Sequence, residues 1–167
     1  FLFSEKAIIA LTMTFVIIAR QIDLSVASII AVSSCVLGYT TSLGYDTWLV
    51  ISLTLLSGAI CGAFNGAIIT KFAIPSIIVT IGTMSLFRGL AYSFLEDSYY
   101  NKFPKLVSNL GGGYLFGYIP YAFLTFIILA IIFAFILHKT SVGKKIYSIG
   151  NNPDAAQYTG IAVDKYT

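Results

Sequence analysis

Long stretches without a charged side chain constrain this sequence more than any other feature. They cover residues 24–45, 47–70, 72–87 and 106–137. A transmembrane helix needs about 20 mostly apolar residues, and most of these windows supply that length. Of all residues, 57% are hydrophobic and only 10% are charged, whereas about 25% are charged in a typical soluble domain. The sequence therefore predicts an all-α, polytopic helical membrane protein.

Charges and helix-breaking residues divide the chain into five candidate membrane helices. We place them at residues 7–19, 24–39, 48–70, 74–95 and 121–137. The first lies between Lys6 and Arg20 and covers only about 20 Å at 1.5 Å per residue, which is less than a bilayer core of about 30 Å. Either its flanking charges reach the interface, or this helix ends inside the protein.

Basic residues predict the orientation of these helices. If the chain after residue 137 is cytoplasmic, the inside segments carry six of them: Arg20, Lys71, Lys139, Lys144, Lys145 and Lys165. The outside segments carry three: Lys6, Lys102 and Lys105. This distribution agrees with the positive-inside rule. We therefore predict one partial transmembrane domain over residues 1–167, with a cytoplasmic segment at residues 138–167.

The connection between the fourth and fifth candidate helices, residues 96–120, contains a glycine triplet, two prolines and several Tyr and Phe residues. Tyr favours the headgroup level of a membrane, so we expect an ordered interfacial loop with a partly re-entrant stretch. The chain begins at Phe1 rather than Met and stops just beyond a polar segment. We therefore expect it to be a fragment of a larger membrane protein.

The third candidate helix contains small residues at a spacing of four. Gly58, Gly62 and Gly66 fall on one helix face, beside alanines with the same spacing. A face of this kind lets a second backbone approach closely in a membrane, so the three glycines are predicted to serve helix packing. Asn65 lies next to this face. We expect it to hydrogen-bond to a neighbouring helix, and direct contact with substrate is the alternative.

Five polar side chains in or beside the spans are candidate pathway or gating residues: Asp23, Ser25, Asn65, Thr83 and Arg88. Polar groups in a membrane helix face other helices or a wet cavity, because lipid offers them no hydrogen-bond partner.

Two of these candidates are charged, and each has a structural alternative. Asp23 lies three residues after Arg20, so it either pairs with Arg20 or accepts from free N–H groups at the start of the next helix. Arg88 either marks a functional site within the membrane or extends to the outer interface, where Glu96 and Asp97 could pair with it.

The combinations of residues that common enzymes use for catalysis cannot be assembled from this sequence. No P-loop motif is present, so ATP hydrolysis by this route is excluded. Cys35 and Cys61 lie in apolar windows and are expected to be buried packing residues, while the single His138 lies at a helix end. We expect no catalysis, no metal site and no cofactor bound by this chain. The basic residues are dispersed, which argues against a nucleic-acid partner.

Residues 142–161, "VGKKIYSIGNNPDAAQYTGI", form a polar segment with the signals of one very short helix. Asn152 is suited to the N-cap, Pro153 to the first helical position and Asp154 to the positive end of the helix dipole. Ala155 and Ala156 favour helix. Gly160, beyond them, is placed to end it. The segment is too polar and too short to span a membrane. An ordinary surface loop is the alternative.

Three stretches resemble a known family. "RQIDLSVASIIAVSS", "GAFNGAIITKFAIPSIIVTIGTMSLFRGLAYSF" and "KTSVGKKIYSIGNNPDAAQYTGI" are similar to the permease subunits of bacterial carbohydrate ABC importers, the group that serves ribose, xylose, arabinose, galactose, rhamnose and autoinducer-2. The similarity extends in order over about residues 7 to 163.

The resemblance implies the partners of this chain. They are a second permease subunit, two cytoplasmic ATP-binding subunits that carry ATP and Mg, a periplasmic sugar-binding protein and the lipid of the bacterial inner membrane. It also implies that residues 149–161 form a coupling helix that docks on the ATPase. The residues matching the family pattern there are Gly150, Asn152, Pro153, Asp154, Ala155, Ala156 and Gly160.

One motif departs from the family pattern. The family commonly has Gly-Gly-Ile-Asp-Leu-Ser-Val-Gly-Ser, whereas this chain has Arg20 and Gln21 in place of the two first glycines and Ala27 in place of the last. The backbone freedom that glycine gives is reduced there. This departure bears on the geometry of the first turn and on the preference for a particular sugar.

The resemblance implies ATP-driven alternating access, with a monosaccharide or related small polyol-like solute passing between two permease subunits. Two alternatives from other classes stay open on the residues alone. A secondary carrier or channel would need an ion-coupling group, for which Asp23 and Arg20 are the candidates in this chain. A membrane scaffold that transports nothing predicts no effect on uptake when Asp154, Ala155 or Gly160 is changed.

Overall fold

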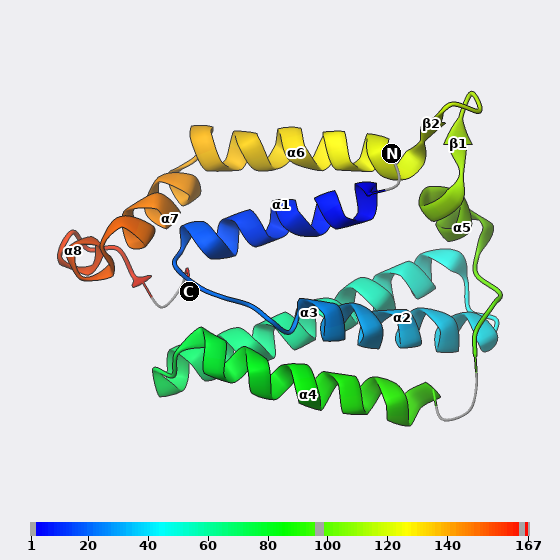
Figure 1. Ribbon diagram of the computed structural model, residues 1–167, viewed down its shortest axis with the longest axis horizontal. Coiled ribbons are helices and arrows are strands. Elements are labelled where there is room, and N and C mark those ends of the chain that lie inside the picture. Colours follow the sequence, from blue (N-terminus) through cyan, green and yellow to red (C-terminus); the bar gives the residue numbers. More distant parts are fainter. Residues whose placement is uncertain (1–2, 96–98, 164–165, 167) are drawn as a thin grey trace. The chain divides into compact units, whose positions relative to one another are not determined.

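The computed structural model describes residues 3–95, 99–163 and 166. The chain forms two compact units, one of residues 1–22 and 109–167 and one of residues 23–108 (Figure 1). Both are mainly helical. The prediction of one permease domain over residues 1–167 stays a prediction.

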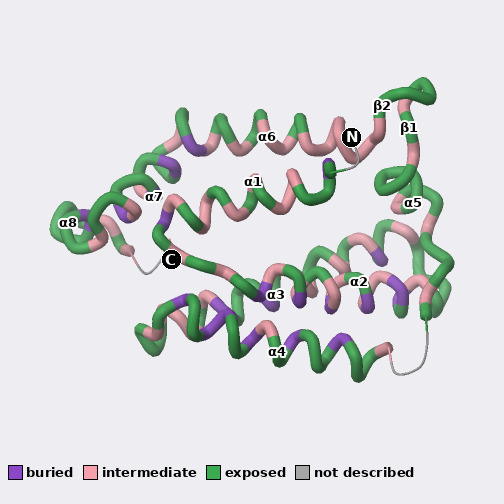
Figure 2. The backbone as a smooth tube through the Cα atoms, viewed as in Figure 1, coloured by how far each residue is buried: buried purple, intermediate pink, exposed green. Residues whose placement is uncertain are grey.

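The unit of residues 23–108 is built from three apolar helices. They are α2 (Val26–Ser42), α3 (Thr47–Phe72) and α4 (Ser76–Leu95), and α2 packs against both of the others. Asp46 caps α3, because its carboxylate accepts from the Trp48 backbone N–H at 3.0 Å. The helices close around an apolar cluster of Val32, Cys35, Cys61, Phe87 and Ala91. Figure 2 shows buried positions recurring along α2 and α4. Both cysteines are free and buried, as the sequence predicts.

The other unit pairs two helices far apart in the sequence. α1 (Ser4–Ile18) lies beside α6 (Tyr121–Lys139) (Figure 1), and the rings of Phe15 and Phe133 meet edge to face with centroids 4.9 Å apart. α7 (Ser141–Asn151) and α8 (Pro153–Tyr158) follow α6. These two helices, with the end of α1, carry most of the candidate site.

All five predicted membrane segments are helical, with ends that differ by a few residues from the prediction. In the described part of the chain, α3, α4 and α6 are long and apolar enough to cross a membrane. α2 is apolar but has 17 residues, and α1 has 15. The short first segment expected from the sequence is therefore present as a short helix.

Two helices and a hairpin were not predicted. The loop expected over residues 96–120 contains α5 (Lys105–Gly112) and a two-stranded ladder of β1 (Tyr114–Leu115) and β2 (Ile119–Pro120). The segment read as carrying one short helix contains two, because α7 precedes α8. A turn of Phe116 and Gly117, both with positive φ, closes the hairpin. The hairpin depends on local turn geometry, which gives almost no hydrophobic periodicity, whereas α5 and α7 are amphipathic and were missed for another reason: neither forms a long apolar window.

Candidate functional site

The start of α8 is fixed by its own first residues. The Asn152 side-chain Oδ1 accepts from the Ala155 backbone N–H at 3.1 Å, and Pro153 occupies the first helical turn. Asp154 adds a negative charge to that turn, where the helix dipole is positive. The predicted N-cap, proline and acidic residue are all confirmed in these positions.

The end of α8 is fixed by a Schellman motif. Gly160 has φ +84°, its N–H donates to the Gln157 carbonyl at 3.0 Å, and the Ile161 N–H donates to the Ala156 carbonyl at 3.1 Å. This pair of hydrogen bonds satisfies carbonyls that the last helical turn leaves free. The prediction that Gly160 ends the helix is confirmed.

The two sides of α8 differ in exposure. Ala156 is only 3% exposed, whereas Tyr158 is 92% exposed. Asp154, Ala155 and Gln157 are exposed as well. The helix is held through one small side chain, and its outer side presents a carboxylate, an amide and an aromatic ring.

α7 fixes the place of α8 against the rest of its unit. Thr140 caps α7 by accepting from the Gly143 N–H at 3.3 Å, and Ile146 and Ile149 are buried. A Cβ on Gly150 would collide with the Ile18 carbonyl at the end of α1. Gly150, predicted as a coupling residue, therefore lets α7 approach α1 closely. Its part in coupling stays a prediction.

A second contact ties the chain after α8 back to α7. The Lys145 ammonium donates to the Tyr166 hydroxyl at 3.0 Å and lies 5.2 Å from the centre of that ring. Sequence reasoning assigned Lys145 only to the inside charge count. Its partner is 21 positions away, and no sequence pattern marks such a pair.

In the unit of α2, α3 and α4, three candidate pathway residues form one hydrogen-bonded chain. The Asp23 carboxylate accepts from both the backbone N–H and the hydroxyl of Ser25, at 2.8 and 2.6 Å. The Asn65 Nδ2 donates to the Ser25 hydroxyl at 2.8 Å. The expected hydrogen bond of Asn65 to a neighbouring helix is confirmed, and Asp23 serves the segment that starts α2.

Arg20, the alternative partner of Asp23, belongs to the other unit, so that pairing stays a prediction. Arg20 is exposed with φ +61°. α1 ends at Ile18, so the two residues do not share a helix face. Arg20 stands where the resembling family commonly has the first glycine, and it adopts a backbone conformation that favours glycine.

The remaining pathway candidates lie on α4. Thr83 is buried, and its hydroxyl donates to the Thr80 carbonyl at 3.4 Å within the helix. Arg88 is exposed. Its proposed partners, Glu96 and Asp97, lie outside the described residues. Among the described residues, no hydrogen bond joins Thr83 or Arg88 to the Asp23–Ser25–Asn65 network. Their roles in the pathway or in gating stay predictions.

The three packing glycines of α3 have different surroundings. A Cβ on Gly58 would lie 3.2 Å from the Ser33 hydroxyl of α2, whereas nothing described lies within 4 Å of one on Gly62 or Gly66. Gly58 thus faces a neighbouring helix in this chain. The packing role of the other two stays a prediction.

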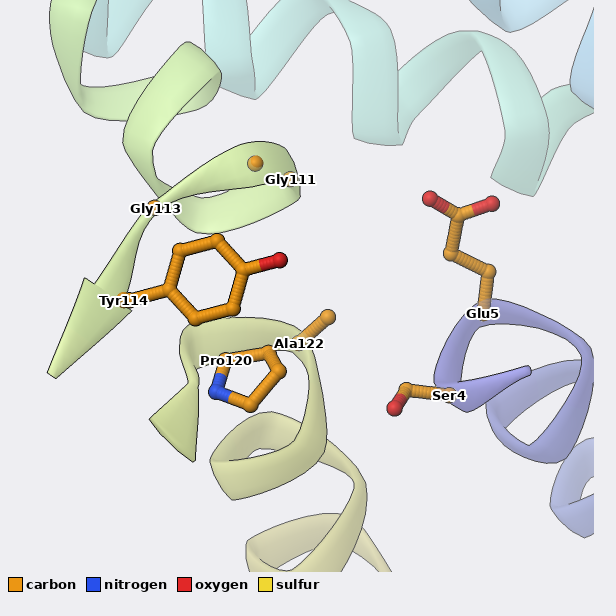
Figure 3. Close-up of a pocket in the computed structure, with 8 residues that line it drawn as sticks. Ser4, Glu5, Gly111, Gly113, Tyr114, Pro120 and Ala122 are labelled. Carbon is orange, nitrogen blue, oxygen red and sulfur yellow. The ribbon is translucent and has the colours of Figure 1, made fainter. Parts of the chain in front are cut away.

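A cavity of about 170 Å³ lies beside the hairpin. Ser4 and Glu5 of α1 line one side, and the Tyr114 ring, Pro120 and the glycines that end α5 line the other (Figure 3). The residues that the structure describes contain no cluster of three or more His, Cys, Asp or Glu side chains that could hold a metal ion. This cavity therefore has acceptor and aromatic groups but no metal-ligand set.

Comparison with known proteins decides the family. The family model described as "Branched-chain amino acid transport system / permease component" matches residues 1–167. The chain belongs to this permease family. Membership agrees with the apolar spanning helices and makes this permease chain a membrane protein.

Individual relatives agree with the family assignment. The permease chain is 36% identical to the ribose import permease protein RbsC of Haemophilus influenzae, over 97% of this chain and 51% of the relative. It is 32% identical to the autoinducer 2 import system permease protein LsrC of Escherichia coli O9:H4, over 94% and 46%. It is 34% identical to LsrD of Klebsiella pneumoniae, over 94% and 49%.

The permease chain thus spans about half the length of the curated relatives it matches. The predicted resemblance to carbohydrate import permeases is confirmed by these relatives. No solved structure is significantly similar to the permease chain.

Proposed function

We propose that this chain is part of the membrane-spanning subunit of an ATP-driven importer in the bacterial inner membrane. The family membership and the import permeases of ribose and autoinducer 2 among its relatives support this proposal. ATP is hydrolysed on separate cytoplasmic subunits, which also hold the Mg. A second permease subunit and a periplasmic binding protein complete the assembly.

The solute is a monosaccharide or a related small polyol-like molecule. Relatives named for ribose and for autoinducer 2 favour this class over amino acids, although the family description names branched-chain amino acid transport. Uptake of labelled sugars and of leucine by cells with and without the full-length permease separates the two classes. Loss of leucine uptake alone would overturn the sugar assignment.

The coupling role belongs to α8 and its flanking residues. The observation that carries it is a helix capped at both ends, with Asp154, Ala155 and Tyr158 exposed on its outer side. A preformed short helix loses little conformational entropy on docking. The family resemblance assigns the matching segment to contact with the ATPase.

Substitution of one exposed alanine tests this role. Ala155→Arg in the full-length permease keeps the cap and the buried Ala156, but it places a long charged side chain on the docking side. We expect at least a tenfold loss of solute-stimulated ATP hydrolysis and loss of ATPase subunits on copurification, because a buried unpaired charge at an interface costs several kcal/mol.

Ala162→Arg is the matched control, since Ala162 is exposed but lies beyond α8. It should retain copurification and stimulated hydrolysis. If Ala155→Arg behaves like this control, α8 does not dock on the ATPase.

A further inference from the structure

The core of the α2–α3–α4 unit is polar at one end. Six of the buried polar residues gather there, whereas Thr40 lies near the other end of α2. The six are Ser25, Ser28, Asn65, Ser76, Thr80 and Thr83. They lie at the start of α2, in the last third of α3 and in the first half of α4. The apolar cluster around Cys35 and Phe87 lies further along α2 and α4. Polar side chains inside a membrane bundle need partners, because hydrocarbon supplies none.

The hydrogen-bond chain from Asp23 fixes the orientation of the Asn65 amide. A carboxylate only accepts, so the single proton of the Ser25 hydroxyl is donated to Asp23. The Ser25 oxygen must then accept from Asn65 Nδ2. Exchange of the amide nitrogen and oxygen would break this chain. Asn65 Oδ1 therefore points away from Ser25.

Asn65 Oδ1 and the Ser28 hydroxyl are both buried, and neither has a hydrogen-bond partner among the described residues. Asn65 is 4% exposed and Ser28 is fully buried. Other hydroxyls of α2 bond within the helix, as Thr40 does to the Val36 carbonyl at 2.7 Å. Ser28 makes no bond of this kind; the residue four positions earlier precedes the helix, which begins at Val26.

The two unpaired groups belong to the same α2–α3 contact, because Asn65 bonds to Ser25 at the start of α2. Ser28 lies one turn along α2 from Ser25, the residue that Asn65 contacts, and residues three apart share a helix face with Cβ atoms about 5–6 Å apart. No direct hydrogen bond joins Ser28 to Asn65. A buried water bonds to polar groups that are otherwise unsatisfied, and one water is small enough for an enclosed place of this kind.

We propose that Ser28 and Asn65 bind one internal water molecule, which links α2 to α3 within the polar end of the core. The water donates to Asn65 Oδ1 and exchanges a hydrogen bond with the Ser28 hydroxyl. With the carboxylate of Asp23 it completes a continuous hydrogen-bonded chain from the segment before α2 into the bundle. This site is independent of the function proposed above.

A double-mutant cycle on the purified full-length permease tests the water site. Ser28→Ala, Asn65→Ala and the double variant are unfolded with SDS in mixed micelles. We expect Ser28→Ala to lower the folded-to-unfolded ratio by about three- to tenfold, because it leaves Asn65 Oδ1 and the water with one partner fewer. In the Asn65→Ala background the same change should alter the ratio by less than about twofold.

Ser34→Ala is the matched control, since Ser34 is on α2 but exposed, and it should show no coupling to Asn65. A gain in stability on Ser28→Ala in the otherwise unchanged protein overturns the proposal, because deleting an unsolvated hydroxyl removes a penalty. If the Asn65→Ala variant does not fold, the direction of the stability change caused by Ser28→Ala still tests the proposal.

A high-resolution map of the full-length permease must also show one density peak within hydrogen-bonding distance of the Ser28 and Asn65 side chains. A direct hydrogen bond between these two side chains, or a bound cation between them, contradicts the proposal.

Discussion

Single residues in left-handed backbone conformations mark the ends of two helices. Arg20 follows α1 with φ +61°, and Ala73 ends α3 with φ +51°. Neither is glycine, although glycine adopts this region without the steric cost that a Cβ brings. Both positions therefore carry local strain that the surrounding helices hold in place.

Ala73→Gly should stabilise the full-length protein by roughly 0.5 to 1 kcal/mol, because it relieves the left-handed alanine at the C-cap of α3. Ala67→Gly is the opposite control, since Ala67 is an exposed residue within the same helix. It should destabilise by a similar amount. The midpoints of SDS unfolding for the two variants should shift in opposite directions. Equal shifts would mean that Ala73 is not strained.

Capping residues decide where α7 and α8 begin and end. Asn152 is at once the C-cap of α7 and the N-cap of α8, so one side chain divides two short helices. Isolated helices of this length are marginal in water. The cap, Pro153 and the Schellman motif at Gly160 stabilise α8 as a helix.

Asn152→Ala should raise the opening of α8 about fivefold, because loss of an N-cap costs about 1 kcal/mol. Hydrogen exchange of the amides of residues 155–161 in the full-length protein measures this opening. Asn151→Ala, at the neighbouring exposed position, removes no cap and should leave exchange unchanged. Equal exchange in both variants would show that packing of Ala156 alone maintains the helix.

At the scale of the whole molecule, orientation in the membrane decides what α8 can contact. The basic residues predict that residues 138–167 lie on the cytoplasmic side, where the proposed ATP-binding partners would dock. This orientation predicts that the cavity near Glu5 and Tyr114 belongs to the outer side of its unit, since α6 separates the hairpin from α7 in the sequence.

Cysteine labelling tests this orientation. In a Cys35→Ala, Cys61→Ala background of the full-length permease, Ser148→Cys on α7 should react with a membrane-impermeant maleimide only after the inner membrane is opened. Tyr118→Cys in the hairpin turn should react in intact spheroplasts. Both residues are exposed, so burial will not mask the reaction. The reverse pattern would place α8 outside and remove the basis for coupling.

The sequence by itself determined the elements whose physics is local. Apolar windows of this length span a membrane as helices, because a helix satisfies its own backbone hydrogen bonds. The cap, proline and glycine around residues 152–160 specify α8 by local interactions alone. α5 and α7 were missed although both are amphipathic, because a search for long apolar windows does not find short helices of mixed polarity. Thr140 caps α7, and Ile146 and Ile149 bury its apolar face.

Tertiary structure decided which polar residues meet. Asn65 is 40 positions from Ser25 in the chain, and only the packing of α2 on α3 joins it to the local Asp23–Ser25 pair. The Ser28 hydroxyl is buried without a hydrogen-bond partner among the described residues. The family resemblance predicts that Gly150 is a coupling residue. The structure shows that a glycine is also needed there for packing, because α1 approaches α7 closely at this position. Hydrogen bonds and close contacts depend on distances of a few ångströms between helices, and periodicity along one helix does not contain those distances.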